Sequence, residues 1–195
     1  MRVHPHLFGS SEFDRRSTQF RFSPLQFGGQ RPAVAYCGED DAAVLSETLF
    51  HTVDTTGGSG RPRQVYLTKY IAWQWSPIAF ERALTLIRID DPGLASIGVT
   101  RAQLVESDQR SYPSITQWGQ RLLAVEPDAD GLLWYSRQAP GRLAVLLLES
   151  GKGRSGGVYR ADVHGTGPSV PFLSAQGLER LDQVADDLDI TVIRS

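Results

Sequence analysis

The sequence predicts an α+β protein, with a single compact domain in which a mixed or antiparallel sheet is flanked by helices. The chain has 195 residues, enough for one substantial core or at most two small ones. Segments with strand character outnumber helical ones, and the two kinds do not alternate as they do in doubly wound parallel sheets. The apolar segments 131–136 and 143–149 are joined by a turn containing Pro and Gly, which is typical of a hairpin at the centre of a sheet.

The first part of the chain is expected to hold short extended segments joined by turns. Residues 2–4 and 33–36 have the composition of strands. Phe20–Phe22 is also expected to be extended, because Pro24 disfavours helix in the residues before it. Gly28-Gly29 predicts a turn between Phe22 and the strand at 33–36.

A helix is predicted from Asp40 to Val53. Asp40 and Asp41 stand where an N-cap and a favourable first turn are expected. Apolar residues then recur at helical spacing, and Glu47 lies inside their stripe. Burying a carboxylate is costly unless it is paired or used. Three interpretations remain open for Glu47: a solvated helix edge, a structural salt bridge, or a functional group.

The remaining strands and loops follow from the same patterns. Segments 64–70 and 83–89 are predicted strands, and 190–193 is a closing strand. The Gly-rich segments 54–62 and 151–157 are predicted loops.

Three further helices are predicted from their capping residues. Thr100, with Gln103 in the capping-box position, begins a short helix. Residues 112–125 keep helical spacing, with Ser114 as the expected cap, and Ser174 is expected to cap a last helix that runs to Leu188.

Composition excludes several classes of protein. The net charge is −2 and the isoelectric point about 6.1, whereas nucleic-acid binders usually show a basic face. Cys37 is the single cysteine, so no internal disulfide is possible, and catalysis by this thiol is less expected than burial. The N-terminus lacks a signal-peptide core, and no apolar run reaches membrane-spanning length. A cytoplasmic protein is expected.

The familiar site motifs are missing from the sequence. It contains no phosphate-binding GxxxxGK[ST] loop, no Gly-x-Ser-x-Gly nucleophile elbow and no HExxH or CxxC motif. Gly57–Gly60 does not directly follow a predicted strand, so it fails as a dinucleotide fingerprint. His4 and His6 have no third ligand nearby, and no metal site is expected.

Several side chains with useful chemistry stand at predicted strand ends and on the first helix. Arg21 could clamp a phosphate, Tyr36 could stack on a planar heterocycle, and Glu47 could stabilise an oxocarbenium-like centre. Ser136 could hold a ribose or phosphate oxygen, and Arg137 follows it. This set suits cleavage of an N-glycosidic bond in a dinucleotide. The alternatives are a surface ion pair for Arg21, a core position for Tyr36 and a turn position for Ser136.

At these residues the chain resembles the RES-domain family, the toxin halves of RES–Xre toxin–antitoxin modules. The matching pieces are Arg2-Val3-His4-Pro5, Arg21-Phe22-Ser23-Pro24, Val34-Ala35-Tyr36, Ala42-Ala43, Ser46-Glu47, Phe50-His51 and the segment Gly131–Arg137. Their order and the spacing from Tyr36 to Glu47 carry the resemblance. It implies a single RES domain over residues 1–195, with a fold similar to that of ADP-ribosyltransferase toxins.

The resemblance also implies an enzyme that consumes NAD by breaking the nicotinamide–ribose bond. Arg21 would anchor the NAD phosphates, Tyr36 would face the nicotinamide and ribose, and Glu47 would stabilise positive charge at the anomeric carbon. Ser136 would bind ribose or an acceptor phosphate, and Arg137 would add to the anion site. The loop after Arg21 is longer than in the family's shorter form and adds Arg31 as a second candidate for the phosphates.

The acceptor stays open at this point. Phosphate would make the protein an NAD phosphorylase and water a glycohydrolase, whereas a protein target would make it an ADP-ribosyltransferase. A binding module without catalysis is the alternative outside the enzyme class. NAD would be the substrate, with no prosthetic group. The resemblance further implies an Xre-type antitoxin as partner and a homodimer. No binding to nucleic acid or membrane is expected, because the sequence shows no basic patch and no long apolar run.

Overall fold

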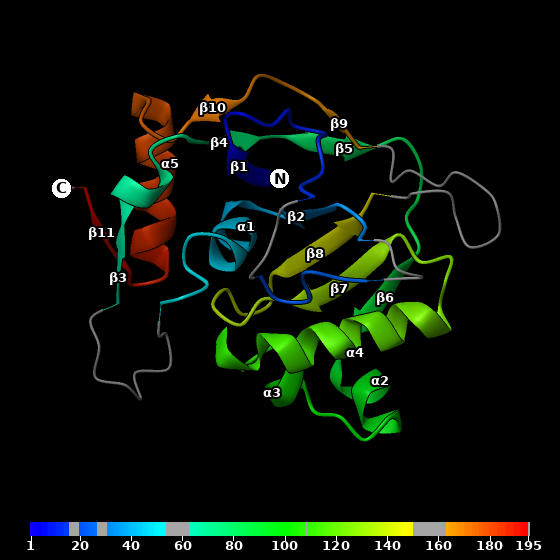
Figure 1. Ribbon diagram of the computed structural model, residues 1–195. Helices are drawn as coiled ribbons and strands as arrows, with labels where there is room; N and C mark the ends of the chain where they lie inside the picture. Colours follow the sequence, from blue (N-terminus) through cyan, green and yellow to red (C-terminus); the bar gives the residue numbers. More distant parts are fainter. Residues whose placement is uncertain (16–19, 27–30, 54–62, 108, 150–162, 195) are drawn as a thin grey trace.

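A seven-stranded mixed sheet forms the centre of the computed structural model, with strand order β10-β4-β1-β2-β8-β7-β6 (Figure 1). The structure describes all residues except 16–19, 27–30, 54–62, 108, 150–162 and 195. The strands of this sheet are β1 (Arg2–Pro5), β2 (Val34–Gly38), β4 (Trp73–Ser76), β6 (Leu86–Ile89), β7 (Gly131–Tyr135), β8 (Leu143–Leu148) and β10 (Val170–Pro171). β6 and β7 are parallel and the other neighbours antiparallel, which confirms the α+β prediction.

Helices and two small sheets surround this sheet. The helices are α1 (Asp41–Glu47), α2 (Asp91–Ser96), α3 (Arg101–Leu104), α4 (Tyr112–Val125) and α5 (Ala175–Asp187), with 3₁₀ turns η1 (Leu67–Tyr70) and η2 (Gln109–Ser111). The small sheets pair β3 (Gln64–Tyr66) with β11 (Thr191–Ile193) and β5 (Ile78–Phe80) with β9 (Val163–Gly165). Among the described residues, no helix has the length and apolar character needed to cross a membrane.

The predicted hairpin of β7 and β8 is confirmed and stands beside β2 in the sheet. Side chains alternate between the two sheet faces, as a pleated strand requires. Val34 and Tyr36 of β2 face the core beneath α2, α3 and α4, whereas Ala35 and Cys37 face the opposite side. Burial raises the pKa of the Cys37 thiol to about 11, so this side chain is a protonated core group.

Two separate hydrophobic cores lie on either side of the first helix. One is built on β2, β6, β7, β8 and α4, and includes Phe22 and Trp134. The other joins α1 to β1, β4 and α5, and includes Phe50 and Trp75. In Figure 1 α1 stands between the α5 side and the α4 side of the molecule. A side chain at the end of α1 can therefore contact groups from both halves.

The first helix begins where predicted but ends early. The Asp40 side chain accepts a hydrogen bond from the Ala43 amide at 2.8 Å, as an N-cap does. The last helical residue is Glu47, so the prediction of a helix to Val53 is wrong. The Thr48 hydroxyl donates to the Val44 carbonyl at 2.6 Å, and the Phe50 amide bonds to the Leu45 carbonyl at 2.9 Å, which closes a wider turn. The prediction was too long because Leu49, Phe50 and Val53, which continue the apolar spacing, are buried after the helix has ended.

Three other predictions need correction. Phe20–Phe22 is a tight turn instead of an extended segment, with the Ser23 amide bonded to the Phe20 carbonyl at 3.0 Å. Only the first part of segment 64–70 is a strand, because η1 starts at Leu67. Helix α4 has Ser111 at its N-cap position, and Ser114 lies inside the helix.

Other predicted elements are confirmed with adjusted ends. Thr100 and Gln103 form the capping box, and the Ser174 hydroxyl accepts from the Gly177 amide at 3.0 Å. The segment predicted as 83–89 is a strand from Leu86, and the closing strand is β11. Local patterns did not predict β4, β5, β9, β10 and α2, which are all short. The predicted turn at 28–29 and the loops 54–62 and 151–157 lie outside the described residues.

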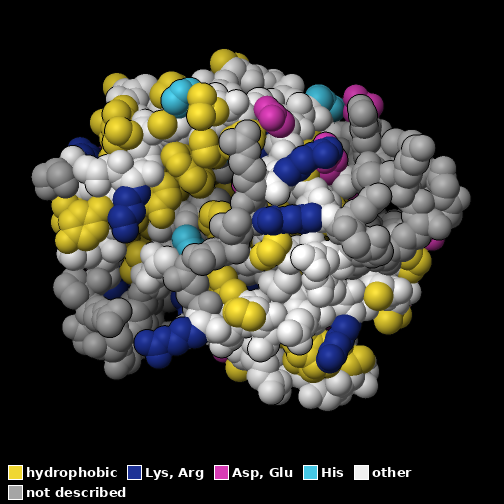
Figure 2. Space-filling model, in the orientation of Figure 1, with side chains coloured by type: hydrophobic (Ala, Val, Ile, Leu, Met, Phe, Trp, Pro, Cys, Tyr) yellow, Lys and Arg dark blue, Asp and Glu magenta, His cyan; other side chains and the backbone are white. Residues whose placement is uncertain are grey.

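An apolar surface lies where β1, η1 and β10 end. The His6 amide bonds to the Ala72 carbonyl at 2.7 Å, and the Phe172 amide to the Trp73 carbonyl at 3.0 Å. Each of these contacts lies next in sequence to an exposed apolar residue: Leu7, Ile71 and Leu173. Figure 2 shows apolar side chains gathered in this upper-left region.

Acid should destabilise the fold through His4. This side chain is buried on β1, with Nε2 2.7 Å from the Ser76 hydroxyl. Burial, with a smaller contribution from nearby Arg2, lowers the pKa of His4 to about 4. Between pH 6.5 and 4 the unfolded chain therefore binds a proton at His4 that the folded chain does not bind. This difference should lower the unfolding free energy by about 3 kcal/mol as the pH falls from 6.5 to 4.

The measurement is the unfolding free energy by urea at pH 7 and pH 4.5. His4→Gln should lose less stability on acidification than the wild type, whatever its stability at pH 7. His6→Gln, at an exposed histidine, is the matched control. Equal acid losses in His4→Gln and the wild type would contradict the assignment.

Candidate functional site

Arg21 is presented by a tight turn whose shape is unusual for its residues. Phe22, the third residue of the turn, has a positive φ of 62°. That conformation costs a bulky side chain about 1–3 kcal/mol. The cost is offset because the Phe22 ring is fully buried, 5.4 Å from the Trp134 ring and against Gly119 of α4. Burial of Phe22 thus explains why an extended segment is not formed and why Arg21 points inward.

The Arg21 guanidinium is 5% exposed and only partly paired. Its Nη1 donates to the Leu104 carbonyl at 2.7 Å, and the group lies 5.6 Å from the centre of the Tyr112 ring. Its Nε is 3.8 Å from Oε2 of Glu47 and has no hydrogen-bond partner. A buried N–H group next to a carboxylate, without a hydrogen bond of its own, is free to serve a ligand.

Glu47 is buried at the C-terminal end of α1, with 7% of its side chain exposed. The hydroxyl of fully buried Ser136 donates to its Oε1 at 2.8 Å. Ser136 directly follows β7, and its oxygen also lies 3.4 Å from the Ala139 amide. The interpretation of Glu47 as a solvated helix edge is therefore wrong, since one carboxylate oxygen is held by Ser136 and the other faces Arg21.

Tyr36 holds Arg21 from the other side. Its hydroxyl donates a short hydrogen bond to the Arg21 carbonyl, and its partly buried ring lies 5.4 Å from Phe20. Burial raises the pKa of Tyr36 well above its usual value, and the neighbouring Tyr112 and Glu47 raise it further. The hydroxyl therefore stays protonated as a donor. It is committed to the backbone of Arg21, which leaves the ring as the part of Tyr36 that can face a ligand.

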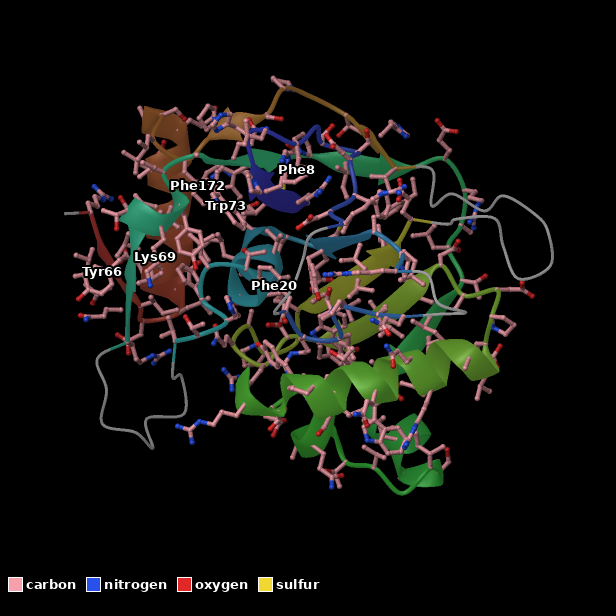
Figure 3. The ribbon with its side chains drawn as sticks, in the orientation of Figure 1. Phe8, Phe20, Tyr66, Lys69, Trp73 and Phe172 are labelled. Carbon is pink, nitrogen blue, oxygen red and sulfur yellow. The ribbon has the colours of Figure 1, made fainter. Side chains whose placement is uncertain are left out.

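Phe20 and His51 belong to this site although sequence reasoning gave them no role. Their rings are 5.5 Å apart, and Figure 3 shows Phe20 beside α1. The His51 Nδ1 makes a short hydrogen bond to the Thr48 carbonyl, so Nδ1 carries the proton and Nε2 is the acceptor. Burial lowers the pKa of His51, with Arg21 and Arg137 contributing, which keeps the ring neutral. The sequence signal that could have identified them is their position: Phe20 precedes Arg21 directly, and His51 follows Glu47 by four residues.

The two remaining predicted arginines differ from Arg21. Arg137 is half-buried and donates to two backbone carbonyls, that of Glu106 at 3.2 Å and that of His51 at 3.4 Å. It thereby ties the turn after α1 to the turn after α3. Arg31 is exposed and lies three residues before β2. Of the two candidates for the phosphates, Arg21 is the one placed beside Glu47.

The structure thus brings four predicted residues together: Arg21, Tyr36, Glu47 and Ser136. They offer a buried carboxylate, a guanidinium with an unused N–H group and an aromatic surface. A carboxylate in such a setting stabilises a developing positive charge, and a guanidinium binds anions. No group of metal-ligating side chains occurs in the described part of the chain. The arrangement suits a ligand that combines phosphate with a centre that becomes cationic.

Comparison with known proteins gives one family. The family described as "RES domain" matches residues 1–164 of the chain. No curated protein and no solved structure matches it.

Removing the Ser136 hydroxyl should destabilise the protein through Glu47. Ser136→Ala leaves one carboxylate oxygen without its buried donor, and a hydrogen bond to a charged group contributes about 1.5–3 kcal/mol. Unfolding by urea at pH 7 should show a loss in this range. Ser96→Ala, at an exposed hydroxyl, should change stability by only a few tenths of a kcal/mol. A Ser136→Ala protein as stable as the Ser96→Ala control would contradict the described pairing.

Proposed function

The chain belongs to the RES-domain family, because the family match covers most of its length, and on this premise we propose that it is a toxin that degrades NAD. RES-domain proteins are in general toxins paired with antitoxins, and membership indicates a function connected with NAD. The specific proposal is cleavage of the nicotinamide–ribose bond, with phosphate or water as the acceptor. The buried Glu47, held by Ser136 and facing Arg21, is the observation that supports it most.

The proposed reaction follows from the chemistry of these groups. The bond between the ribose C1′ and the nicotinamide nitrogen breaks, and its electron pair leaves with nicotinamide. The ribose carbon becomes oxocarbenium-like, and the carboxylate of Glu47 stabilises that charge. An oxygen of phosphate then forms the new bond and gives ADP-ribose phosphate. With water as acceptor, a proton is released and ADP-ribose forms.

The other residues are assigned supporting roles. Arg21 binds the diphosphate of the dinucleotide through its unused N–H groups. Ser136 fixes one oxygen of Glu47, so that the other stays directed toward the reacting centre. The rings of Tyr36 and Phe20 offer an aromatic surface for the nicotinamide or ribose. Tyr36 acts on Arg21 as well, since its hydroxyl holds the Arg21 backbone.

The direct test is to incubate the purified protein with NAD, with and without phosphate, and to resolve the products by mass. ADP-ribose phosphate formed only with phosphate would identify a phosphorylase, and ADP-ribose in both reactions a hydrolase. Intact NAD in both reactions would contradict NAD degradation and favour a transferase lacking its protein target or a binding module.

Glu47→Gln should abolish most of this activity. The amide keeps the size of the side chain and an oxygen for Ser136, but it removes the charge that stabilises the ribose cation. We expect kcat to fall at least about 100-fold, the scale seen when one electrostatic contact to a transition state is lost. Glu126→Gln, at an exposed residue after α4, is the matched control and should keep full activity. Equal kcat values for the Glu47 and Glu126 variants would exclude Glu47 as the catalytic carboxylate.

Growth provides a test in cells. Expression of the chain alone should stop growth and deplete NAD, and Glu47→Gln should relieve both effects. We propose an Xre-type antitoxin as the partner that suppresses this toxicity, and a homodimer as the toxin's own assembly. Toxicity that persists unchanged in both Glu47→Gln and Arg21→Ala would contradict NAD degradation as its cause.

A further inference from the structure

A third arginine lies beside Ser136 and was not singled out in the sequence. Arg101 is the first residue of α3, and its Nη2 donates to the carbonyl of Tyr135 at 3.2 Å. That carbonyl belongs to the peptide bond that joins Tyr135 to Ser136. This hydrogen bond to the backbone therefore holds the Arg101 guanidinium next to the candidate site.

The charge of Arg101 is only loosely matched. Its nearest carboxylate is Glu106, with Nε and Oε1 3.8 Å apart, and the Glu106 side chain is 48% exposed. At that distance the pair has no hydrogen bond, and an exposed pair contributes little. The Nε of Arg101 is buried and has no hydrogen-bond partner. Such a group is satisfied when a ligand supplies the acceptor.

Arg137 contacts the same turn. It donates to the backbone carbonyl of Glu106, the residue whose carboxylate faces Arg101. Both carbonyls that accept from Arg137 are uncharged, and its Nε is also buried without a partner. The hydroxyl of Ser107, the next residue of this turn, is a further buried polar group without a partner. Unused donors from three residues thus gather around one turn.

The electrostatics of this region favour an anion. Arg21 lies near the Glu47 carboxylate and Arg101 near that of Glu106, whereas Arg137 contacts backbone carbonyls. Among the described residues that make these contacts, positive charges exceed negative ones, and the Glu106 side chain is 48% exposed. The Leu104 carbonyl receives Arg21, so all three guanidinium groups contact residues 104–106 or the strand end beside them.

We propose that Arg101 and Arg137 bind a phosphoryl group beside Ser136. The planar N–H fork of arginine matches phosphate oxygens, and the unused Nε groups would donate to them. In the protein without ligand, the Glu106 carboxylate occupies the position of that anion, and binding of the phosphoryl group displaces the carboxylate. This inference rests on the proposed NAD function for the source of the phosphoryl group, which is either the diphosphate of the dinucleotide or the acceptor phosphate.

The first test measures binding without catalysis. The full chain is titrated with ADP-ribose and, separately, with inorganic phosphate by calorimetry. Arg101→Gln should weaken binding of at least one of them about tenfold or more, the scale of one lost charge-assisted hydrogen bond. Arg101→Lys, which keeps the charge, should retain part of the affinity. Arg121→Gln, at an exposed arginine of α4, should bind as the wild type does.

Glu106→Gln provides a second variant that leaves both arginines in place. Removing the competing carboxylate should strengthen binding of the same ligand severalfold. A merely structural role for Arg101 or Glu106 does not predict opposite effects of their two substitutions. Unchanged affinity in both Arg101→Gln and Glu106→Gln, or the absence of any binding of ADP-ribose and phosphate to the wild type, would overturn the proposal.

Comparison of the ligands identifies the source of the phosphoryl group. Weaker binding of ADP-ribose with unchanged phosphate binding assigns the arginines to the dinucleotide, and the reverse assigns them to the acceptor. A wild type that cleaves NAD while Arg101→Gln binds both ligands normally would overturn this inference and leave the proposed function standing. Ligand binding that depends on Arg101 in a protein unable to cleave NAD would support this inference and contradict the proposed function.

Discussion

The burial of the Glu47 carboxylate is the constraint on which the site depends. A buried charge is tolerated only with partners, and removing one partner leaves it uncompensated. The partners of Glu47 come from distant parts of the chain: Ser136 follows β7, and Arg21 lies in an N-terminal turn. The end of α1, the end of β7 and that turn must therefore assemble together. Packing of the two cores on either side of α1 brings them to one place.

The turn that carries Arg21 shows how local strain serves this assembly. Phe22 adopts a left-handed conformation that its side chain disfavours, and its burial against Trp134 offsets the cost. The Arg21 backbone is then held by the Tyr36 hydroxyl and its guanidinium by the Leu104 carbonyl. Strained residues that their surroundings hold in place are frequent at functional sites. Here the strain places a cationic group in the interior of the molecule.

Residues beyond the family match also support the site. Helix α5 lies after residue 164, the last matched residue, and its Arg180 pairs with Asp41 at the start of α1 at 2.6 Å. The Arg180 guanidinium also lies 4.7 Å from the centre of the Trp75 ring. At the other side α1 meets β2 so closely that a Cβ on Gly38 would lie 2.5 Å from the Val44 amide. The helix that carries Glu47 is thus fixed by both its strand and its C-terminal neighbour.

Much of the architecture could be predicted from local patterns. Alternation and turn residues predicted the β7–β8 hairpin, and Asp40, Thr100 and Ser174 act as the helix caps that their residue types indicated. These predictions hold because capping and strand alternation depend on neighbours along the chain. The boundaries failed where burial favoured a different backbone, as at the turn of Phe22 and after Glu47.

For the site, the residue types and their order along the chain were enough to indicate the family and the four residues Arg21, Tyr36, Glu47 and Ser136. Their arrangement depends on tertiary packing: Ser136 bonds to Glu47, the Tyr36 hydroxyl donates to the Arg21 backbone, and Arg101 lies beside Ser136. These contacts join residues far apart in the chain. Local patterns cannot specify them, because each depends on how the sheet, α1 and α3 pack together.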